Sequence, residues 1–299
     1  MDFYVSWYPG DPDYPRHDPD SALLVSVASV SRQWSLAHFA TCPRRVIIDS
    51  GGYRYAIAPH EALSPTALFQ RQRQILGDSP VEAILCARDY PILNAASSSN
   101  QKDACLTQTI AFAYEFKALL QKQPLPSHWR TMAVIQGYDP DSLVHCAHEL
   151  KQIGFDLYGI GSMAILRRHG PIIERVEAVA SVIEPARLHI FGVSVVSVAR
   201  QLRQLGLHSI DSARPAKAAA YNEVIYSNPY RRFGILEPPQ IPLAGRIPKH
   251  RRLTQPLPCP CPTCRRHPTD ILGVGKRHFI RARALHNYFH LKRVMEGDG

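Results

Sequence analysis

The sequence has no long apolar run. None of its 299 residues belongs to a stretch that approaches the roughly 18–20 uninterrupted apolar residues of a membrane span, so we expect no membrane partner. The opening segment, MDFYVSWYPGDPDYPRHDPD, lacks a basic region followed by an apolar run. We therefore expect no secretory signal and, by default, a cytoplasmic protein. Internal repeats and low-complexity tracts are absent as well.

Cysteine is sparse over most of the chain. Four of the seven cysteines are scattered in apolar contexts, where we expect reduced core thiols: Cys42, Cys86, Cys105 and Cys146. The other three form the motif Cys-x-Cys-x2-Cys at Cys259, Cys261 and Cys264. Disulfides do not suit this motif, because one thiol is always left over and close neighbours form strained rings.

Three thiolates at this spacing match a tetrahedral Zn²⁺ site that needs one more ligand, usually histidine. The downstream candidates are His267, His278, His286 and His290. His286 lies in a segment with a helical pattern and would attach the cysteine loop to the body of the protein. We predict a structural Zn²⁺ site made by Cys259, Cys261, Cys264 and His286, with a redox or adventitious cluster as the alternative. Four protein ligands leave no open position for metal catalysis.

The positive charge is concentrated at one end of the chain. The sequence has 35 Lys and Arg against 25 Asp and Glu, a formal net charge of +10. Residues 231–299 contain fourteen of the basic and four of the acidic residues, so the first 230 residues are neutral overall. This asymmetry indicates a polyanionic partner bound by the C-terminal part. The alternative is a solvated basic face without a partner.

Short β-branched runs alternate with helical stretches along most of the chain. Helices are expected from Ser64-Pro65, over 102–122, and from Asp139-Pro140 to Gly154. Eight strands are expected, at 3–7, 23–27, 46–49, 82–86, 131–135, 156–160, 188–191 and 208–210. This order is typical of parallel strands with helices outside, and the number favours an α/β fold of the (β/α)₈ TIM-barrel type. A doubly wound open sheet is the alternative.

The alternation breaks at about residue 228. The following segment is rich in Pro and Arg, and we expect an irregular insertion without a hydrophobic core of its own. A helical pattern returns in KRHFIRARALHNYFHLKRVM. We therefore predict a single domain over 1–299, with a basic zinc-binding subdomain at about 230–290 and a closing C-terminal helix.

Polar residues follow five of the predicted strands. They are Asp49 with two glycines after it, Asp89, Gln136-Gly137, Gly161-Ser162 and Asp211. In a barrel, functional groups gather just beyond the carboxyl ends of the strands. Carboxylates, an amide and bare backbone at one rim suit a flat polar heterocycle such as a purine. A single Asp at a strand end is more often a helix cap, but five positions in succession favour a site.

These motifs together resemble the tRNA-guanine transglycosylases, zinc-containing (β/α)₈ barrels that exchange a guanine in nucleic acid for a 7-deazaguanine. The resemblance covers about residues 46–295. Its motifs are IIDSGGYRY (47–55), AVIQGY (133–138), GFDLYGIGSMA (154–164), IFGVSVVSVARQLRQLGLHSIDSARPAKAAAY (190–221), LPCPCPTC (257–264) and RALHN (283–287). The DSA, CPCPTC and ALHN forms look nearer to the archaeosine-forming branch than to the queuosine-forming one.

The resemblance implies a role for each matching residue. Asp211 would be the nucleophile that attacks C1′ and forms a covalent glycosyl-enzyme, and Asp49 the general acid/base. The heterocycle would be bound by Ser50, Tyr53, Asp89, Gln136, Gly161 and Ser162, with Tyr53 stacked on its face. The target base would leave its stack to reach the pocket. Phosphates would be contacted by Arg214, Lys217, Arg265 and Arg266.

Departures from the family pattern shape the expected substrate. Arg167 and Arg168 lie near the position where queuosine-forming enzymes place a Glu beside the aminomethyl group of their substrate. We therefore expect a neutral 7-substituent, as in 7-cyano-7-deazaguanine. With no room after residue 299, we also expect the extra RNA-binding domains of the archaeosine-forming enzymes to be missing. The polymer is tRNA by family default, with DNA close behind, because a branch of the superfamily modifies DNA.

Two other functions are alternatives to this interpretation. A non-catalytic subunit that keeps the fold and binds nucleic acid would have lost Asp49 or Asp211, and both are present. A barrel enzyme of free-nucleotide metabolism would leave the basic segment unexplained. The family also commonly forms dimers through the zinc region, so a homodimer or a partner subunit is a further expectation.

Overall fold

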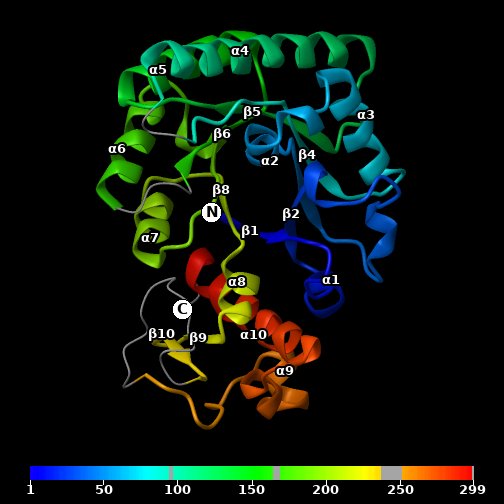
Figure 1. Cartoon of the computed structure of the whole chain (residues 1–299), viewed down its shortest axis with the longest axis vertical. Coiled ribbons are helices and arrows are strands. Elements are labelled where there is room, and N and C mark those ends of the chain that lie inside the picture. Colours follow the sequence, from blue (N-terminus) through cyan, green and yellow to red (C-terminus); the bar gives the residue numbers. More distant parts are fainter. Residues whose placement is uncertain (94–96, 164–168, 237–250, 298–299) are drawn as a thin grey trace.

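Eight parallel strands close into a barrel in the computed structural model, which describes residues 1–93, 97–163, 169–236 and 251–297. Each strand pairs with the next in sequence, and the last pairs with the first, Asp2 opposite Ser209 and Tyr4 opposite Asp211. Figure 1 shows the barrel with its covering helices. This closure excludes the open doubly wound sheet. The strands are β1 (Asp2–Trp7), β2 (Ala22–Ser26), β3 (Arg45–Asp49), β4 (Glu82–Cys86), β5 (Trp129–Ile135), β6 (Leu157–Ile160), β7 (Leu188–Ile190) and β8 (Ser209–Ser212).

Helices connect the strands and cover the outside of the barrel. Those of α type are α1 (Tyr14–His17), α2 (Gly52–Ile57), α3 (Pro65–Leu76), α4 (Ser99–Lys122), α5 (Pro140–Ile153), α6 (His169–Ala180), α7 (Val196–Gln204), α8 (Arg214–Ala220), α9 (Pro262–Arg266) and α10 (Arg277–Glu296). Short 3₁₀ turns are η1 (Val27–Ser29), η2 (Leu36–His38), η3 (Pro59–Glu61), η5 (Pro185–Arg187) and η6 (Pro268–Leu272). No helix within the described ranges is long and apolar enough to cross a membrane.

The predicted helix caps are confirmed. The Ser64 hydroxyl accepts a hydrogen bond from the Ala67 amide at 3.2 Å, at the start of α3. Asp139 does the same for the Ser142 amide at 2.8 Å, at the start of α5. These side chains satisfy amides that have no partner within the first turn of a helix. Gly154 ends α5 with a φ of 80°.

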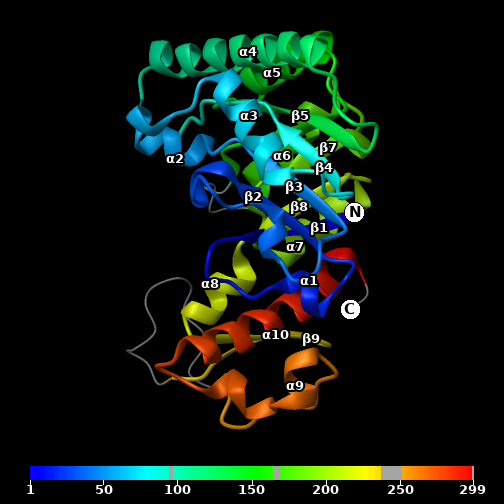
Figure 2. The same cartoon turned by 90° about the vertical axis from the view of Figure 1, so that its right-hand side faces the viewer.

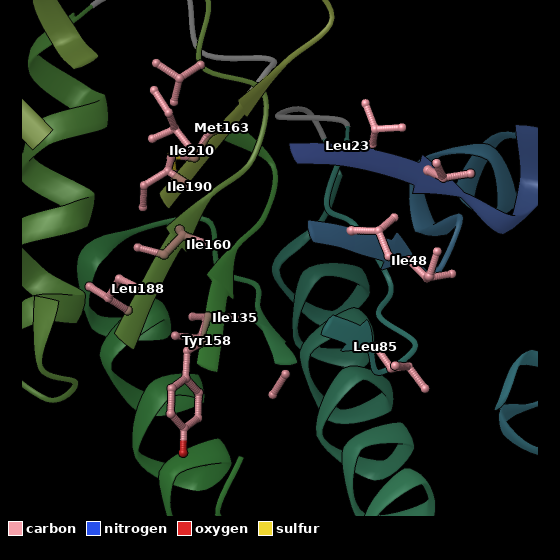
Figure 3. Close-up of a cluster of buried hydrophobic side chains, with 14 of the residues drawn as sticks. Leu23, Ile48, Leu85, Ile135, Tyr158, Ile160, Met163, Leu188, Ile190 and Ile210 are labelled. Carbon is pink, nitrogen blue, oxygen red and sulfur yellow. The ribbon is translucent and has the colours of Figure 1, made fainter. Parts of the chain in front are cut away.

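The hydrophobic core has two layers, separated by the barrel wall. Alternate residues of a strand point to opposite faces, so Ile47 of β3 packs inside the barrel and Ile48 packs outside against the helices. Figure 3 shows ten labelled members of the outer layer, most of them carried by strands. The inner layer is smaller and fills the barrel below its carboxyl rim with Tyr4, Leu24, Ile84, Met132 and Leu157.

The segment after β8 differs from the sequence prediction. An antiparallel hairpin, β9 (Glu223–Ser227) and β10 (Tyr230–Gly234), stands where irregular chain was expected to begin at about residue 228. β9 is buried along its whole length, and Asn228-Pro229, with a cis peptide bond, connects it to β10. Residues 237–250 of the predicted Pro- and Arg-rich insertion lie outside the described residues.

The C-terminal part also has a small apolar cluster of its own, which corrects the expectation that it has none. Its members are Val224, Tyr226, Ile235, Leu253, Cys261, Cys264 and Ile271. The predicted closing helix is confirmed as α10, which packs against α8, β9, α9 and η6. Figures 1 and 2 both show α10 between the barrel and α9. This helix joins the cysteine-bearing subdomain to the barrel.

Candidate active site and metal centre

A cavity of about 480 Å³ opens at the carboxyl ends of the barrel strands. Seven of the predicted site residues line it, together with the basic Lys217: Asp49, Tyr53, Asp89, Gln136, Gly161, Ser162 and Asp211. Ser50, the remaining predicted base-binding residue, is buried directly behind Asp89. The barrel therefore brings together at one rim carboxylates that are up to 162 positions apart in the sequence, Asp49 and Asp211.

Asp49 is the last residue of β3. Its Oδ2 accepts a hydrogen bond from the Gly51 amide at 3.0 Å, and the Ser26 hydroxyl from the end of β2 is a second partner. Burial raises the pKa of the Asp49 carboxyl above its ordinary value, and the negative charge of Asp211 raises it further, against hydrogen bonds from Ser26, Gly51 and Ser50 that lower it. A carboxyl with a raised pKa keeps its proton to a higher pH than an ordinary Asp, which suits a group that exchanges a proton with a bound base.

Asp89 is the centre of a buried polar network. Its Oδ1 accepts a hydrogen bond from the Ser50 hydroxyl at 2.7 Å, and its Oδ2 accepts one from the Gln136 amide nitrogen at 2.7 Å. The Ser162 hydroxyl in turn donates to Gln136 Oε1 at 2.8 Å. Burial, followed by the charge of Asp49, raises the pKa of Asp89 to about 6. The network fixes which way the Gln136 amide faces, so the cavity presents a defined pattern of donors and acceptors.

Two glycines make room for this network. A Cβ atom on Gly52 would lie 2.4 Å from Asp89 Oδ1, and one on Gly161 would lie 2.2 Å from Gln136 Nε2. Any side chain at either position would therefore displace the Asp89 or Gln136 side chain. Both glycines belong to motifs that the sequence singled out, and their steric role explains why the backbone is bare there.

Asp211 lies one residue before the end of β8, and both of its carboxylate oxygens are engaged. The Ser6 hydroxyl from β1 donates to Oδ2 at 2.6 Å, and the Gly192 amide donates to Oδ1 at 2.8 Å. The buried His189 places Nε2 3.4 Å from Oδ1, a charge contact without hydrogen-bond alignment. These groups hold the carboxylate at a fixed orientation beside the cavity.

Sequence reasoning missed the groups that come from β1, β2 and β7. They are Ser6, Ser26, His189 and Gly192, together with the cavity-lining Tyr8 and Phe191. The available signal was positional, since all of them lie on or just after predicted strands. Small hydroxyl residues within an apolar strand give no functional signal by themselves.

Aromatic rings stand at the mouth of the cavity. Tyr53 of α2 is 62% exposed and Tyr8, just beyond β1, is 46% exposed, although both line the cavity. Large exposed aromatic side chains beside a polar pocket offer faces on which a planar base can stack. Stacking by Tyr53 stays a prediction.

The four predicted phosphate contacts differ in their surroundings. The side chain of Arg214 is only 17% exposed and is paired with Glu223. Glu223 also binds Arg232 at 2.6 Å. Lys217 is exposed and lines the cavity, whereas Arg265 and Arg266 are exposed at the end of α9. The three exposed residues can approach a polyanion, whereas Arg214 is engaged by Glu223 at the start of β9.

The three clustered cysteines meet a histidine of α10. The ligand atoms of Cys259, Cys261, Cys264 and His286 all lie within 4.8 Å of one another, so the group could hold a metal ion. His286 Nδ1 lies 3.4 Å from Cys261 Sγ and 3.3 Å from Cys264 Sγ. Backbone amides donate to two of the sulfur atoms, Cys261 N to Cys259 at 3.3 Å and Cys264 N to Cys261 at 3.4 Å. Amide donors favour thiolates, and three thiolates with one imidazole fit a tetrahedral metal centre.

The other candidate histidines fall outside this group. His267 and His278 are both exposed. His290 is buried one turn beyond His286, and its Nε2 lies 3.0 Å from Cys259 Sγ. The Ser227 amide donates to His290 Nδ1 at 3.1 Å, which leaves the proton on Nε2, facing the sulfur. His290 is therefore placed as a donor to a ligand.

Comparisons with known proteins agree with this arrangement. A tRNA-guanine(15) transglycosylase of Methanopyrus kandleri is 28% identical over 257 residues, which cover 84% of this chain and 50% of that protein. The chain thus spans about half the length of this curated relative. The family model described as queuine tRNA-ribosyltransferase matches residues 25–297, which include the rim carboxylates, the cysteine motif and α10. The chain belongs to the queuine tRNA-ribosyltransferase family.

Proposed function

We propose that this protein is a base-exchange transglycosylase, a pentosyltransferase that replaces a guanine in nucleic acid with a 7-deazaguanine. The observation that carries the proposal is the convergence of Asp49, Asp89 and Asp211 on one cavity of about 480 Å³ at the carboxyl rim. Membership of the family and the named activity of the Methanopyrus kandleri relative support the same reaction.

Asp211 is the nucleophile in this mechanism. A carboxylate oxygen of Asp211 forms a bond to C1′ of the target nucleotide as the bond from C1′ to guanine N9 breaks. The Ser6 hydroxyl and the Gly192 amide, at 2.6 and 2.8 Å from its two oxygens, orient the group for attack. The electron pair of the broken bond leaves with the guanine, which takes up a proton.

Asp49 supplies and removes that proton. Its raised pKa favours a protonated carboxyl that can donate to the departing guanine. The resulting carboxylate then takes the N9 proton of the incoming 7-deazaguanine, whose N9 attacks C1′ and releases Asp211. Atoms and charges balance over the cycle, and Asp49 returns to its starting protonation state.

The heterocycle is read by the network around Asp89. The carboxylate of Asp89 accepts from the amine and ring N–H of the base, while the remaining N–H of Gln136 donates to its carbonyl edge. The Gly161 amide already donates to the Ile135 carbonyl at 3.0 Å, so Gly161 borders the base with the bare surface of its backbone. Ser50 and Ser162 hold these groups at 2.7 and 2.8 Å and define the positions for the base. Tyr53 covers the face of the base at the cavity mouth.

The incoming base carries a neutral 7-substituent, such as the cyano group of 7-cyano-7-deazaguanine. This part rests on Arg167 and Arg168, which lie outside the described residues, and on the poor fit between arginine and a cationic aminomethyl group. We expect the cyano base to bind about tenfold more tightly than the aminomethyl base in calorimetric titrations, since one unfavourable charge contact is worth about 1 kcal/mol. Tighter binding of the aminomethyl base would overturn this assignment.

The metal of the C-terminal subdomain is Zn²⁺, held by Cys259, Cys261, Cys264 and His286. The donor set supports this choice, because thiolates and imidazole are the ligands of structural zinc sites. Bound there, the ion supplies a cross-link between the cysteine loop and α10. It also positions the exposed Arg265 and Arg266, next to the ligands, for a phosphate backbone.

The polymer is tRNA by family, with DNA as the close alternative. The basic residues of the C-terminal part bind phosphates, which both polymers carry, so they do not distinguish the two. Incubation of the protein with labelled guanine and either bulk tRNA or duplex DNA, followed by scoring of label in the polymer, tests the proposal. Label in neither polymer, with binding retained, would instead favour a non-catalytic nucleic-acid-binding subunit.

The role of Asp211 is tested in the same assay. Asp211→Asn keeps the size of the side chain and should reduce label incorporation by about 10³-fold or more, while leaving polymer binding intact. Asp141→Asn, at an exposed position of α5, is the matched control. Base exchange at the wild-type rate in Asp211→Asn would show that another group is the nucleophile.

A further inference from the structure

We propose that Arg130, His208, Ser209 and His189 form a chain of hydrogen-bond donors that ends at Asp211 and orients its carboxylate. The catalytic part of this inference rests on the proposed function. Arg130 Nη1 lies 3.5 Å from His208 Nε2, and His208 Nδ1 lies 2.8 Å from Ser209 Oγ. Ser209 Oγ lies 2.8 Å from His189 Nδ1, and His189 Nε2 lies 3.4 Å from Asp211 Oδ1.

The direction of the chain follows from its first member. A guanidinium can only donate, so His208 Nε2 must accept from Arg130 and the His208 proton lies on Nδ1. His208 Nδ1 therefore donates to Ser209, and the Ser209 hydroxyl is left to donate to His189 Nδ1. The proton of His189 then lies on Nε2, facing the Asp211 carboxylate. Burial, together with the charge of Arg130, lowers the pKa of His208 to about 4, which keeps this ring neutral as the chain requires.

The reverse direction would be unfavourable at Asp211. A lone pair on His189 Nε2 would then face the negatively charged Oδ1, which already accepts the Gly192 amide at 2.8 Å. In the donor direction, each hydrogen bond polarises the next, and the positive end of the chain reaches the carboxylate. In the structure the contact at this end is 3.4 Å long and is not aligned as a hydrogen bond, so the chain requires it to tighten when substrate binds, as catalytic contacts do.

The barrel holds the chain in place. His189 of β7 lies directly opposite Ser209 of β8 in the strand register, so the short contact between them follows from strand pairing. His189 is fully buried, with its ring edge-on to Phe191 at 4.5 Å between centroids and to Tyr4 at 6.1 Å. It therefore has little freedom to turn away from Asp211.

The far end of the chain lies at the opposite face of the barrel. Arg130 and His208 line a second cavity there, of about 360 Å³, together with Asp2 and Arg45. The chain thus crosses the barrel interior from the amino-terminal face to the nucleophile. In this arrangement His189 and Ser209 are positioning residues, because they act on substrate only through Asp211.

Ring nitrogen NMR of the two histidines tests the chain without any activity measurement. In the full-length, metal-loaded protein at pH 7, we expect the Nε2–H tautomer for His189 and the Nδ1–H tautomer for His208. The signals are assigned by His189→Gln and His208→Gln. A His189 ring that is doubly protonated, or that carries its proton on Nδ1, would overturn the chain.

Ser209→Ala tests the catalytic consequence. Removing the hydroxyl should abolish the tautomer preference of His189, so that Nε2 no longer directs a proton at the charged Asp211 carboxylate. The loss of that one contact to a charged group should reduce kcat for base exchange by about 10- to 100-fold. KM should change less than about twofold, because the base and phosphate contacts are untouched. His189→Gln, whose amide can still donate to Asp211, should retain more activity than His189→Leu. Ser181→Ala, at an exposed serine, is the matched control.

The outcomes separate this inference from the proposed function. If the wild-type protein exchanges no bases, the proposed function fails, while the tautomers still test the chain. If the wild-type protein is active and Ser209→Ala has the wild-type kcat, the chain does not position Asp211 and the inference fails.

Discussion

At the scale of single residues, the site places three carboxyl groups in one cavity and gives each of them different hydrogen-bond partners. The charge of Asp49 raises the pKa of Asp89 and is the second cause of that shift after burial, whereas the charge of Asp211 raises the pKa of Asp49. Asp89 is compensated by Ser50 and Gln136, which donate to both of its oxygens. Burial of these carboxyl groups thus lowers the free energy of unfolding, and it keeps negative charge in a cavity where a base can bind.

The pH dependence of folding should report this arrangement. Because the pKa of Asp89 is about 6 in the folded protein and 3.8 for an ordinary Asp, the folded state binds the proton more tightly. Its stabilising contribution is complete below about pH 4 and is lost as the pH rises through 6, a change of about 2–3 kcal/mol. Asp89→Asn should remove that part of the decline in unfolding free energy between pH 4 and 7, measured by urea titration. Equal slopes in the variant and the wild type would contradict the raised pKa, and Asp141→Asn should keep the wild-type slope.

At the scale of secondary-structure elements, α10 connects the barrel to the C-terminal subdomain. It buries a complete guanidinium, because Arg283 donates through Nε to the Ala219 carbonyl at 3.0 Å and through Nη1 to Ile271 and Gly273 at 2.9 Å. Nη2 donates to Asn222 Oδ1 at 3.0 Å. These partners are neutral oxygens from α8, η6 and the loops beside them. One side chain therefore supplies the hydrogen bonds that carbonyl groups at the ends of these elements would otherwise lack.

Loss of this guanidinium should destabilise the fold. Arg283→Met fills a similar volume but leaves three buried carbonyls without donors, and we expect a loss of about 3–5 kcal/mol of unfolding free energy. Arg283→Lys keeps the charge but reaches fewer of the oxygens, so its loss should be smaller. Denaturant unfolding of the two variants checks the order. A Met variant as stable as the wild type would show that the carbonyls find other partners.

The same helix should also tune the metal centre through His290. Its Nε2–H faces Cys259 Sγ at 3.0 Å and its Nδ1 is held by the Ser227 amide, so the ring stabilises a thiolate without binding the metal. His290→Leu should weaken zinc affinity by about 10- to 100-fold in a chelator competition, as is typical for partners of metal ligands. His267→Gln, at an exposed histidine, should have no effect. Complete loss of metal from His290→Leu would instead identify His290 as a ligand.

At the scale of the whole molecule, the sequence predicts local features such as strands and helix caps. It does not predict the contacts that form only when the barrel closes. Strand positions, the Ser64 and Asp139 caps and the rim carboxylates follow from periodicity and turn chemistry, and they agree with the structure. Ser6 contacts Asp211 only because β1 closes onto β8, 205 positions away in sequence. The β9–β10 hairpin was missed because Pro and Arg are poor strand signals, and here one face of the hairpin packs on a separate small cluster.

The separate clusters predict how the molecule responds to loss of metal. The barrel has a large outer apolar layer and a smaller inner one, whereas the subdomain has only the small cluster that includes two of the proposed ligands, Cys261 and Cys264. A small core of this kind depends on its metal, so chelation should first unfold the segment from 251 to 276 and weaken polymer binding. Hydrogen exchange should then rise by orders of magnitude in α9 and η6, while β3 and β4 stay protected. A barrel that loses protection together with α9 would mean that the metal stabilises the whole chain through α10.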